Sequence, residues 1–214
     1  MELSEYMLEA LREDEEFILY RGRERQAEAS SVLLLTSAVK RPRLETLEKI
    51  NHEYALKSEL DTAWAVCPRG LSQYNQKTAL VLEDPGGEPL HRLIQGPMEV
   101  KQFLRLAIGL TTALSQLHKR SVMHKDLKPS NVLIDAATGH AWLTGFGIAS
   151  RLPRERHSAE PPEFIAGTLA YMAPEQTGRM NRSIDSRSDL YSLGVTLYEM
   201  LTGKIGRASC RERV

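Results

Sequence analysis

Cysteine, long apolar runs and an excess of one charge are scarce or missing in this chain of 214 residues. Its two cysteines, Cys67 and Cys210, form no disulfide framework and lack the spacing of a metal site. Without an apolar run of about 18 residues, we expect no membrane insertion. Basic and acidic residues number 28 each, so a formal net charge of zero gives no reason to expect nucleic-acid binding. The N-terminus lacks a signal-peptide core, which favours a cytoplasmic protein.

The strongest motif is the run His124-Lys125-Asp126-Leu127-Lys128-Pro129-Ser130-Asn131. Its functional groups suit phosphoryl transfer, in which a protein mainly positions the reactants and stabilises charge. Asp126 could orient a hydroxyl and accept its proton, Lys128 could stand beside the moving phosphoryl group, and Asn131 could bind Mg²⁺ through its amide oxygen. An ordinary polar loop before a buried strand is the alternative, but the number of specific matches favours a catalytic loop.

Further segments follow this loop in the order found in protein kinases, which the chain resembles. Gly145-Phe146-Gly147 stands where kinases have D-F-G, and residues 167–175 resemble the segment that ends the activation loop at A-P-E. Residues 189–194 resemble the start of the central helix of the C-terminal lobe. The resemblance implies a two-lobed α+β protein-kinase-like fold. We expect a small β-rich N-lobe at about residues 5–84 and an incomplete helical C-lobe at about 88–203.

The run from Ala173 to Asp185 is similar to one family in particular, the Ser/Thr-kinase-like N-terminal domain of large hybrid signalling proteins. In that family ATPase-like, GAF and histidine-kinase regions follow. The resemblance implies that the partners are other proteins or further domains of the same polypeptide. Residues 204–214 match one reading frame of a common sequencing adapter, so we expect a non-native tail on a truncated C-lobe. A natural basic tail is the alternative.

The parts that would hold ATP and Mg²⁺ depart from the kinase pattern. Gly145 replaces the aspartate that would bind the metal, and glycine has no side-chain oxygen for it. The glycine positions of the phosphate-binding loop fall on Arg12, Asp14 and Phe17. The acidic residues at 13–16 would repel phosphate there, or are simply the solvated tip of a hairpin.

The lysine–glutamate pair and the hinge are also irregular. Glu53 is the natural candidate for the helix glutamate, but counting back puts its lysine partner near Leu35. Lys40 follows an A-V sequence as a kinase lysine does, although an exposed lysine after the strand is the alternative. Glu83 lies in the hinge that would contact adenine, and Pro85 shortly after it lacks a backbone N–H.

Apolar patterning predicts the individual helices and strands. We expect strands near residues 6–11, 17–20, 32–35, 78–82 and 132–135, and helices at about 42–56 and 98–117. A further helix is predicted to include Val195, Leu197, Tyr198 and Leu201. The first helix should bury the face that carries Leu44, Leu47, Ile50, Tyr54 and Leu56.

Two functions compete for this sequence. We expect a Ser/Thr protein-kinase-like signalling domain that has lost catalysis, a pseudokinase that acts as a regulatory or docking module and binds ATP and Mg²⁺ weakly or not at all. The alternative is an unconventional active Ser/Thr kinase, which would transfer the γ-phosphoryl group of ATP to protein hydroxyls.

Overall fold

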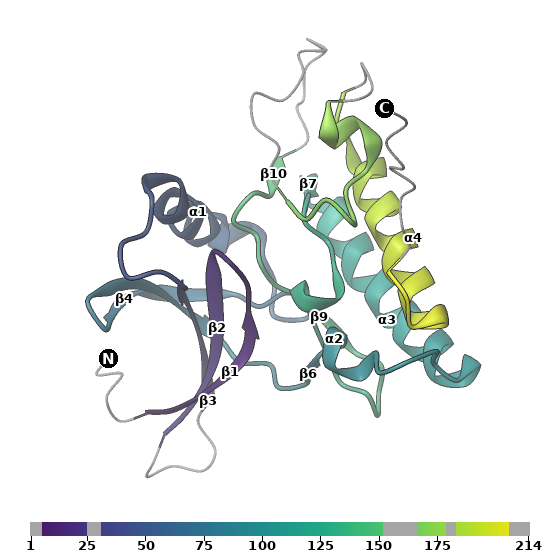
Figure 1. Ribbon diagram of the computed structural model, residues 1–214, viewed down its shortest axis with the longest axis horizontal. Coiled ribbons are helices and arrows are strands. Elements are labelled where there is room, and N and C mark those ends of the chain that lie inside the picture. Colours follow the sequence, from purple (N-terminus) through teal and green to yellow (C-terminus); the bar gives the residue numbers. More distant parts are fainter. Residues whose placement is uncertain (1–5, 25–30, 152–166, 179–182, 206–214) are drawn as a thin grey trace, which may run out of the picture.

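The computed structural model describes residues 6–24, 31–151, 167–178 and 183–205. The N-terminal part is an antiparallel sheet with strand order β1-β2-β3-β5-β4, and helix α1 packs beside it (Figure 1). Its elements are β1 (Tyr6–Glu13), β2 (Phe17–Glu24), β3 (Ser31–Ser37), α1 (Leu44–Ala55), the 3₁₀ turn η2 (Leu56–Glu59), β4 (Pro68–Tyr74) and β5 (Lys77–Glu83). The expected strands at the first four positions are confirmed, and β4 is an addition that patterning missed.

Strand β3 is the central strand of this sheet, and both of its faces are buried. Successive side chains of a strand point to opposite faces. Leu33 and Leu35 accordingly belong to the apolar cluster that includes Ile50 of α1, whereas Val32 and Leu34 join the cluster on the other face. A continuous apolar run is the pattern that such two-sided burial requires.

Helix α1 forms where the sequence predicts it, but its buried face differs from the expected one. Ile50 and Leu56 are buried as predicted, whereas Leu44 is 71% exposed and Tyr54 is 38% exposed. Thr46 and Glu53 are buried in their place. The prediction was wrong because it followed apolar residues, while α1 turns two polar side chains inward.

The C-terminal part is mainly helical, with α3 and α4 in contact along the right of Figure 1. Its helices are α2 (Leu90–Leu93), α3 (Val100–Lys119) and α4 (Ser186–Thr202), and the 3₁₀ turns are η3 (Pro129–Asn131) and η4 (Pro174–Thr177). Short strands complete it: β6 (Glu88–Pro89), β7 (Val122–Met123), β8 (Val132–Ile134), β9 (Ala141–Leu143) and β10 (Ser150–Arg151). The fold is therefore the expected α+β arrangement, with a β-rich first lobe and a helical second one.

The core of the second lobe lies under the loop that carries the catalytic motif. Leu110 and Leu114 of α3 share one buried cluster with Leu127, Phe146 and Met200. The strand expected at 132–135 is confirmed as β8, whose three side chains are all buried. Tyr198 and Leu201 of the expected α4 pattern are instead exposed.

Two further predictions concern membrane insertion and the C-terminal tail. No helix among the residues described is long and apolar enough to cross a membrane. Most of the expected non-native tail, residues 206–214, lies outside the described ranges, and Cys210 lies there too. The nature of that tail stays a prediction.

Candidate active site

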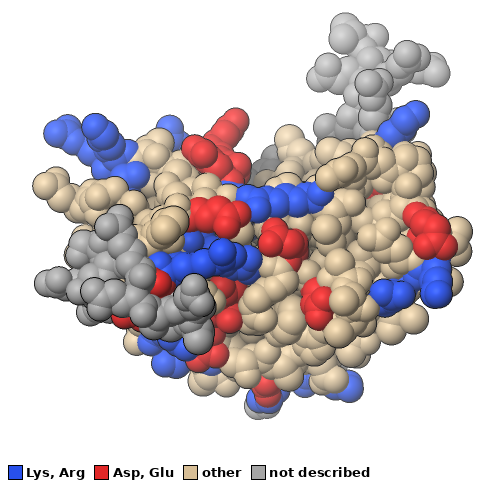
Figure 2. Space-filling model, turned by 90° about the horizontal axis from the view of Figure 1, so that it is seen from below, with Lys and Arg blue, Asp and Glu red and all other residues tan. Residues whose placement is uncertain are grey.

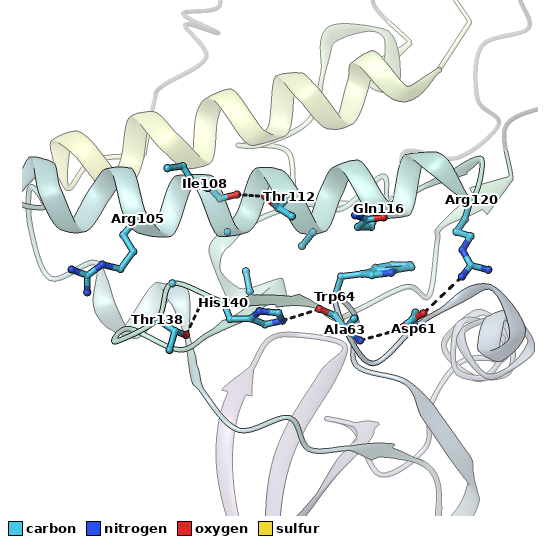
Figure 3. A pocket seen from close by; sticks show the side chains of 14 residues that line it. Asp61, Ala63, Trp64, Arg105, Ile108, Thr112, Gln116, Arg120, Thr138 and His140 are labelled. Carbon is cyan, nitrogen blue, oxygen red and sulfur yellow. Dashed lines mark hydrogen bonds and ion pairs between the residues drawn. The ribbon is translucent and has the colours of Figure 1, made fainter.

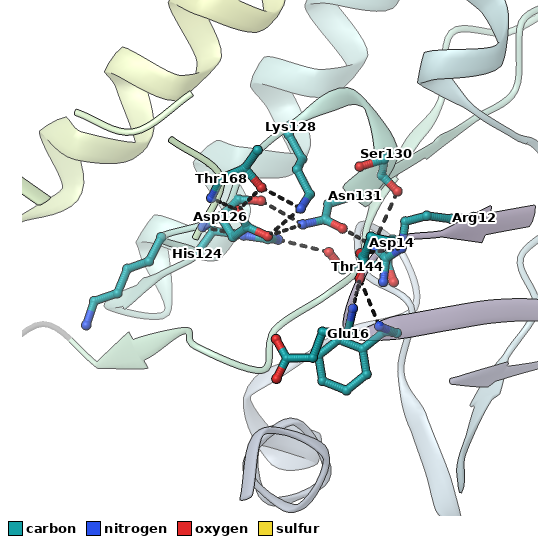
Figure 4. A network of polar contacts seen from close by, with 12 residues as sticks. Arg12, Asp14, Glu16, His124, Asp126, Lys128, Ser130, Asn131, Thr144 and Thr168 are labelled. Atoms are coloured by element: carbon teal, nitrogen blue, oxygen red, sulfur yellow. Dashed lines mark hydrogen bonds and ion pairs between the residues drawn. The ribbon is translucent and has the colours of Figure 1, made fainter. Parts of the chain in front are cut away.

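Asp126 is at the centre of a polar network between β7 and η3 (Figure 4). One carboxylate oxygen accepts hydrogen bonds from the backbone N–H of Thr168 at 2.9 Å and from its hydroxyl at 3.0 Å. The other accepts from Asn131 Nδ2 at 3.0 Å and pairs with Lys128 Nζ at 2.9 Å. The structure thus brings together the three residues predicted to be catalytic.

The network keeps Asp126 ionised. Burial alone would raise the pKa of its carboxyl, but the charge and hydrogen bond of Lys128, together with the hydrogen bond from Thr168, outweigh burial. The pKa of Asp126 is therefore lowered, which suits a carboxylate that accepts a hydrogen bond from a substrate hydroxyl.

Asp189 holds the catalytic loop from below, a role that sequence reasoning missed. Its carboxylate accepts the backbone N–H groups of His124 at 2.9 Å and Lys125 at 2.8 Å, and it contacts His118 Nε2 at 2.8 Å. These bonds support Lys125 at φ +67°, a left-handed conformation that a non-glycine residue seldom adopts. An aspartate on the buried face of α4 was the available signal, but its partners are more than 60 residues away.

His124 connects the loop to Phe146. Its ring is fully buried, with Nε2 3.1 Å from the Thr144 carbonyl and Nδ1 3.3 Å from the Asp126 backbone N–H. This pairing requires the neutral tautomer that carries its proton on Nε2. Burial lowers the pKa of His124 in agreement with that tautomer. The Phe146 ring lies 5.0 Å away, so Phe146 packs as an apolar residue that needs no metal.

The position expected for Mg²⁺ is occupied by an arginine side chain. Arg12 Nη1 donates to Asn131 Oδ1, the amide oxygen that would face a metal, and lies 3.4 Å from the Ser130 carbonyl. Arg12 directly precedes the acidic turn but is only 7% exposed.

Gly145 lies beside this contact. Its φ of +82° is left-handed, and a Cβ placed there would lie 2.9 Å from Asn131 Oδ1. In the part of the chain that the structure describes, no group of three or more His, Cys, Asp or Glu side chains could hold a metal. Because Gly145 has no ligand oxygen and Asn131 is bonded to Arg12 and Asp126, these two positions as placed do not fit Mg²⁺.

Glu53 is buried without the lysine that a kinase would pair with it. Its Oε1 is buried and has no hydrogen-bond partner, while burial raises the pKa of its carboxyl to about 7 despite the charge of Arg12. Leu35 is buried in the apolar cluster that includes Ile50 of α1. Lys40 is exposed on the bend after β3, which is the alternative that the sequence left open.

The hinge after β5 is held by an ion pair. Arg21 of β2 donates two hydrogen bonds to Asp84, at 2.7 and 3.0 Å, and a third to the Gly87 carbonyl at 2.8 Å. Glu83 ends β5, where its backbone N–H donates to the Cys67 carbonyl at 2.9 Å. Arg21 of the first lobe thus fixes the backbone after β5 at Asp84 and Gly87.

The acidic turn between β1 and β2 is anchored on α1. Asp14 accepts the backbone N–H groups of Glu16 at 3.0 Å and Phe17 at 2.8 Å. Glu16 then pairs with Lys49 at 2.5 Å and accepts the Thr46 hydroxyl at 3.0 Å. The carboxylates of residues 13–15 are exposed, as expected for the solvated tip of a hairpin. Glu16 instead connects the turn to α1.

Two cavities lie away from this network. One of about 870 Å³ lies between α3 and the segments at 61–64 and 138–141, where Arg105, Ile108 and Trp64 are among the residues that line it (Figure 3). The other, of about 390 Å³, adjoins Arg21, Gly87 and Asp135. Neither includes Asp126 or Asn131 among its lining residues.

The order of elements and the loop held by Asp189 define the chain as a protein-kinase-like domain. Comparison with known protein families agrees, because the protein kinase domain family matches residues 21–209 of the chain. The chain belongs to this family.

Several bacterial Ser/Thr kinases are similar to the chain. Serine/threonine-protein kinase PknB of Mycobacterium tuberculosis is 34% identical over 157 residues, which are 72% of this chain and 24% of that protein. Serine/threonine-protein kinase A of Synechocystis is 40% identical over 137 residues, 58% of this chain and 26% of that protein. The chain therefore spans about a quarter of the length of these relatives.

Proposed function

We propose that this domain is a pseudokinase, a Ser/Thr protein-kinase-like signalling domain that acts as a regulatory or docking module. The observation that carries the proposal is the contact between Arg12 and Asn131 beside Gly145. Phosphoryl transfer depends on metal ions that neutralise the charge developing on the phosphates. Here one ligand is missing, and the other is already paired with a cation of the protein.

The phosphate-holding parts support the same proposal. Glu53 Oε1 has no partner among the described residues. The turn that would cover the phosphates carries acidic side chains where a kinase has glycines, whose backbone N–H groups bind phosphate closely. Kinases of this family generally use ATP and Mg²⁺. We expect the domain to bind both weakly or not at all.

Phosphate incorporation from radiolabelled ATP tests the proposal. The natural protein and its Asp126→Asn variant should give the same background incorporation. Asp135→Asn is the matched control, since Asp135 lies after β8 and its carboxylate accepts hydrogen bonds from Ala137 and Thr138 of its own turn, away from Asp126. Incorporation that Asp126→Asn abolishes and Asp135→Asn preserves would contradict the proposal.

An unconventional active kinase is the second candidate, and one observation favours it. The ionised Asp126 is already positioned by Lys128 and Thr168, as a catalytic carboxylate must be. The same incorporation assay decides between the two functions.

We also propose that the partners are proteins or further domains of the same polypeptide, in the cytoplasm. The similarity of residues 173–185 to the hybrid signalling proteins supports this. Positive and negative side chains are interspersed on the face in Figure 2, a pattern that offers no broad basic surface there for a polyanion. Cross-linking of a longer natural chain, followed by mass spectrometry, tests it. Cross-links from this domain to a downstream region are expected, and their absence would contradict the intramolecular form of the proposal.

A further inference from the structure

Arg12 is a buried cation beside Asn131, where a kinase would bind Mg²⁺. Its Nη1 contacts Asn131 Oδ1 and the Ser130 carbonyl, and its Nε lies 3.8 Å from Asp14 Oδ2. That Nε is buried and has no hydrogen-bond partner. A buried guanidinium is stable only when nearby acceptors or negative charges compensate for the loss of water. The groups around Arg12 must therefore offset the free-energy cost of its burial.

Glu53 has the complementary deficit. Its Oε1 is buried and unpartnered, while the backbone groups of Phe146 and Gly145 favour the charged form of its carboxyl. Arg12 is the cation whose charge acts on this carboxyl. A buried polar atom without a partner is costly, and here the two unpartnered atoms have opposite charge.

We propose that Arg12 is a resident cation that takes the place of both Mg²⁺ and the strand lysine, holding Asn131 by contact and compensating Glu53 through its charge. A guanidinium suits both tasks, because it is always charged and offers five N–H donors in one plane. The assignment refines the proposed pseudokinase function and rests on it. It also means that repairing Gly145 alone cannot rebuild a metal site.

The reason is steric as well as electrostatic. A side chain at position 145 requires Asn131 to move, since its Cβ would lie 2.9 Å from Asn131 Oδ1. Arg12 holds that same oxygen and would also pair with a new carboxylate. A metal can enter only when Arg12 releases Asn131.

A double-mutant cycle in thermal unfolding tests the coupling of Arg12 to Glu53. Arg12→Met should lower the unfolding midpoint, and adding Glu53→Gln should recover part of the loss, because the uncompensated carboxyl is gone. If Arg12→Met alone does not fold, the folded double variant gives the same answer. Arg21→Met is the matched control, a buried arginine of the same sheet that pairs with Asp84, and its effect should add to that of Glu53→Gln. Additive effects for Arg12, or a double variant that also fails to fold, would overturn the inference.

Binding of Mn²⁺, followed by electron paramagnetic resonance with ADP present, tests the replacement of the metal. Gly145→Asp should bind Mn²⁺ no better than the natural chain. Gly145→Asp with Arg12→Met should bind at least about tenfold tighter. Gly145→Asp with Arg12→Lys, which keeps the charge, should remain weak. Equal Mn²⁺ affinity with and without Arg12 would overturn the inference. Neither experiment measures phosphoryl transfer, so their failure leaves the pseudokinase proposal to the incorporation assay.

Discussion

The two sides of the Asn131 side chain face two regions of the candidate active site that differ in which kinase residues they retain. Its Nδ2 donates to the Asp126 carboxylate, in a network that keeps the groups expected of a kinase catalytic loop. Its Oδ1 accepts from Arg12, on the side where glycine, lysine and aspartate positions have all changed. Asp189 holds the backbone of the catalytic loop through hydrogen bonds to His124 and Lys125, whereas the nucleotide side is formed by contacts between side chains, such as that of Arg12 with Asn131. Under the proposed function, the fold keeps its catalytic loop for a structural reason, the support of Asp189, while the cofactor site is lost.

Removing Asp189 should break the retained region and have the largest effect. Asp189→Ala leaves the backbone N–H groups of His124 and Lys125 without their acceptor, as well as the ring of His118. Breaking such a buried charged network costs about 3–5 kcal/mol. Urea unfolding followed by circular dichroism measures it. A loss no larger than that of Asp135→Ala would show that Asp189 does not support the loop.

The altered region should be recognised by its pH dependence, the next largest effect. The pKa of Glu53 is about 7 in the folded protein against an ordinary value of 4.5. The folded state thus binds the proton more tightly than the unfolded state, and stability falls as the pH rises from about 4.5 to about 7. The contribution is about 2–3 kcal/mol over that window.

Glu53→Gln should remove this slope, as measured by unfolding free energies at several pH values. Glu45→Gln is the control, because Glu45 is exposed on the same helix. The assignment to Glu53 fails if the slope is unchanged in Glu53→Gln.

The anchor of the acidic turn should matter less. Glu16→Gln removes the pair with Lys49, both of whose side chains are about one-third exposed. Pairs of this kind contribute roughly 0.5–1 kcal/mol. The loss should shrink at high salt, which chemical unfolding at two ionic strengths measures. Glu15→Gln serves as control at the exposed tip, and an equal effect there would argue against the anchor.

The smallest expected effect is that of Mg²⁺ on nucleotide binding. Because Gly145 has no ligand oxygen and Asn131 is held by Arg12, adding Mg²⁺ should leave a weak ATP affinity unchanged. Calorimetry with and without the metal decides the matter. Tight binding that appears only with Mg²⁺ would mean that another residue replaces the missing aspartate.

Much of the fold and the catalytic loop could be predicted because their signals are local. The run from His124 to Asn131 places its polar groups at fixed spacing, and β3 and β5 are continuous apolar segments. The buried face of α1 could not be predicted in the same way. Thr46 and Glu53 turn inward because Glu16 and the backbone at residues 145–146 supply polar partners there.

The sequence by itself determined the order of elements, the catalytic loop and the absence of an aspartate at Gly145. Only the tertiary structure decided what each polar group contacts. Asp189 and Lys125 are 64 residues apart, and Arg12 and Asn131 are 119 apart. No local pattern encodes such pairs, because the first depends on how α4 packs within the second lobe and the second on how the two lobes pack. Burial then strengthens the effect of each charge, since Arg12 acts on Asn131 and Glu53 in surroundings from which water is largely excluded.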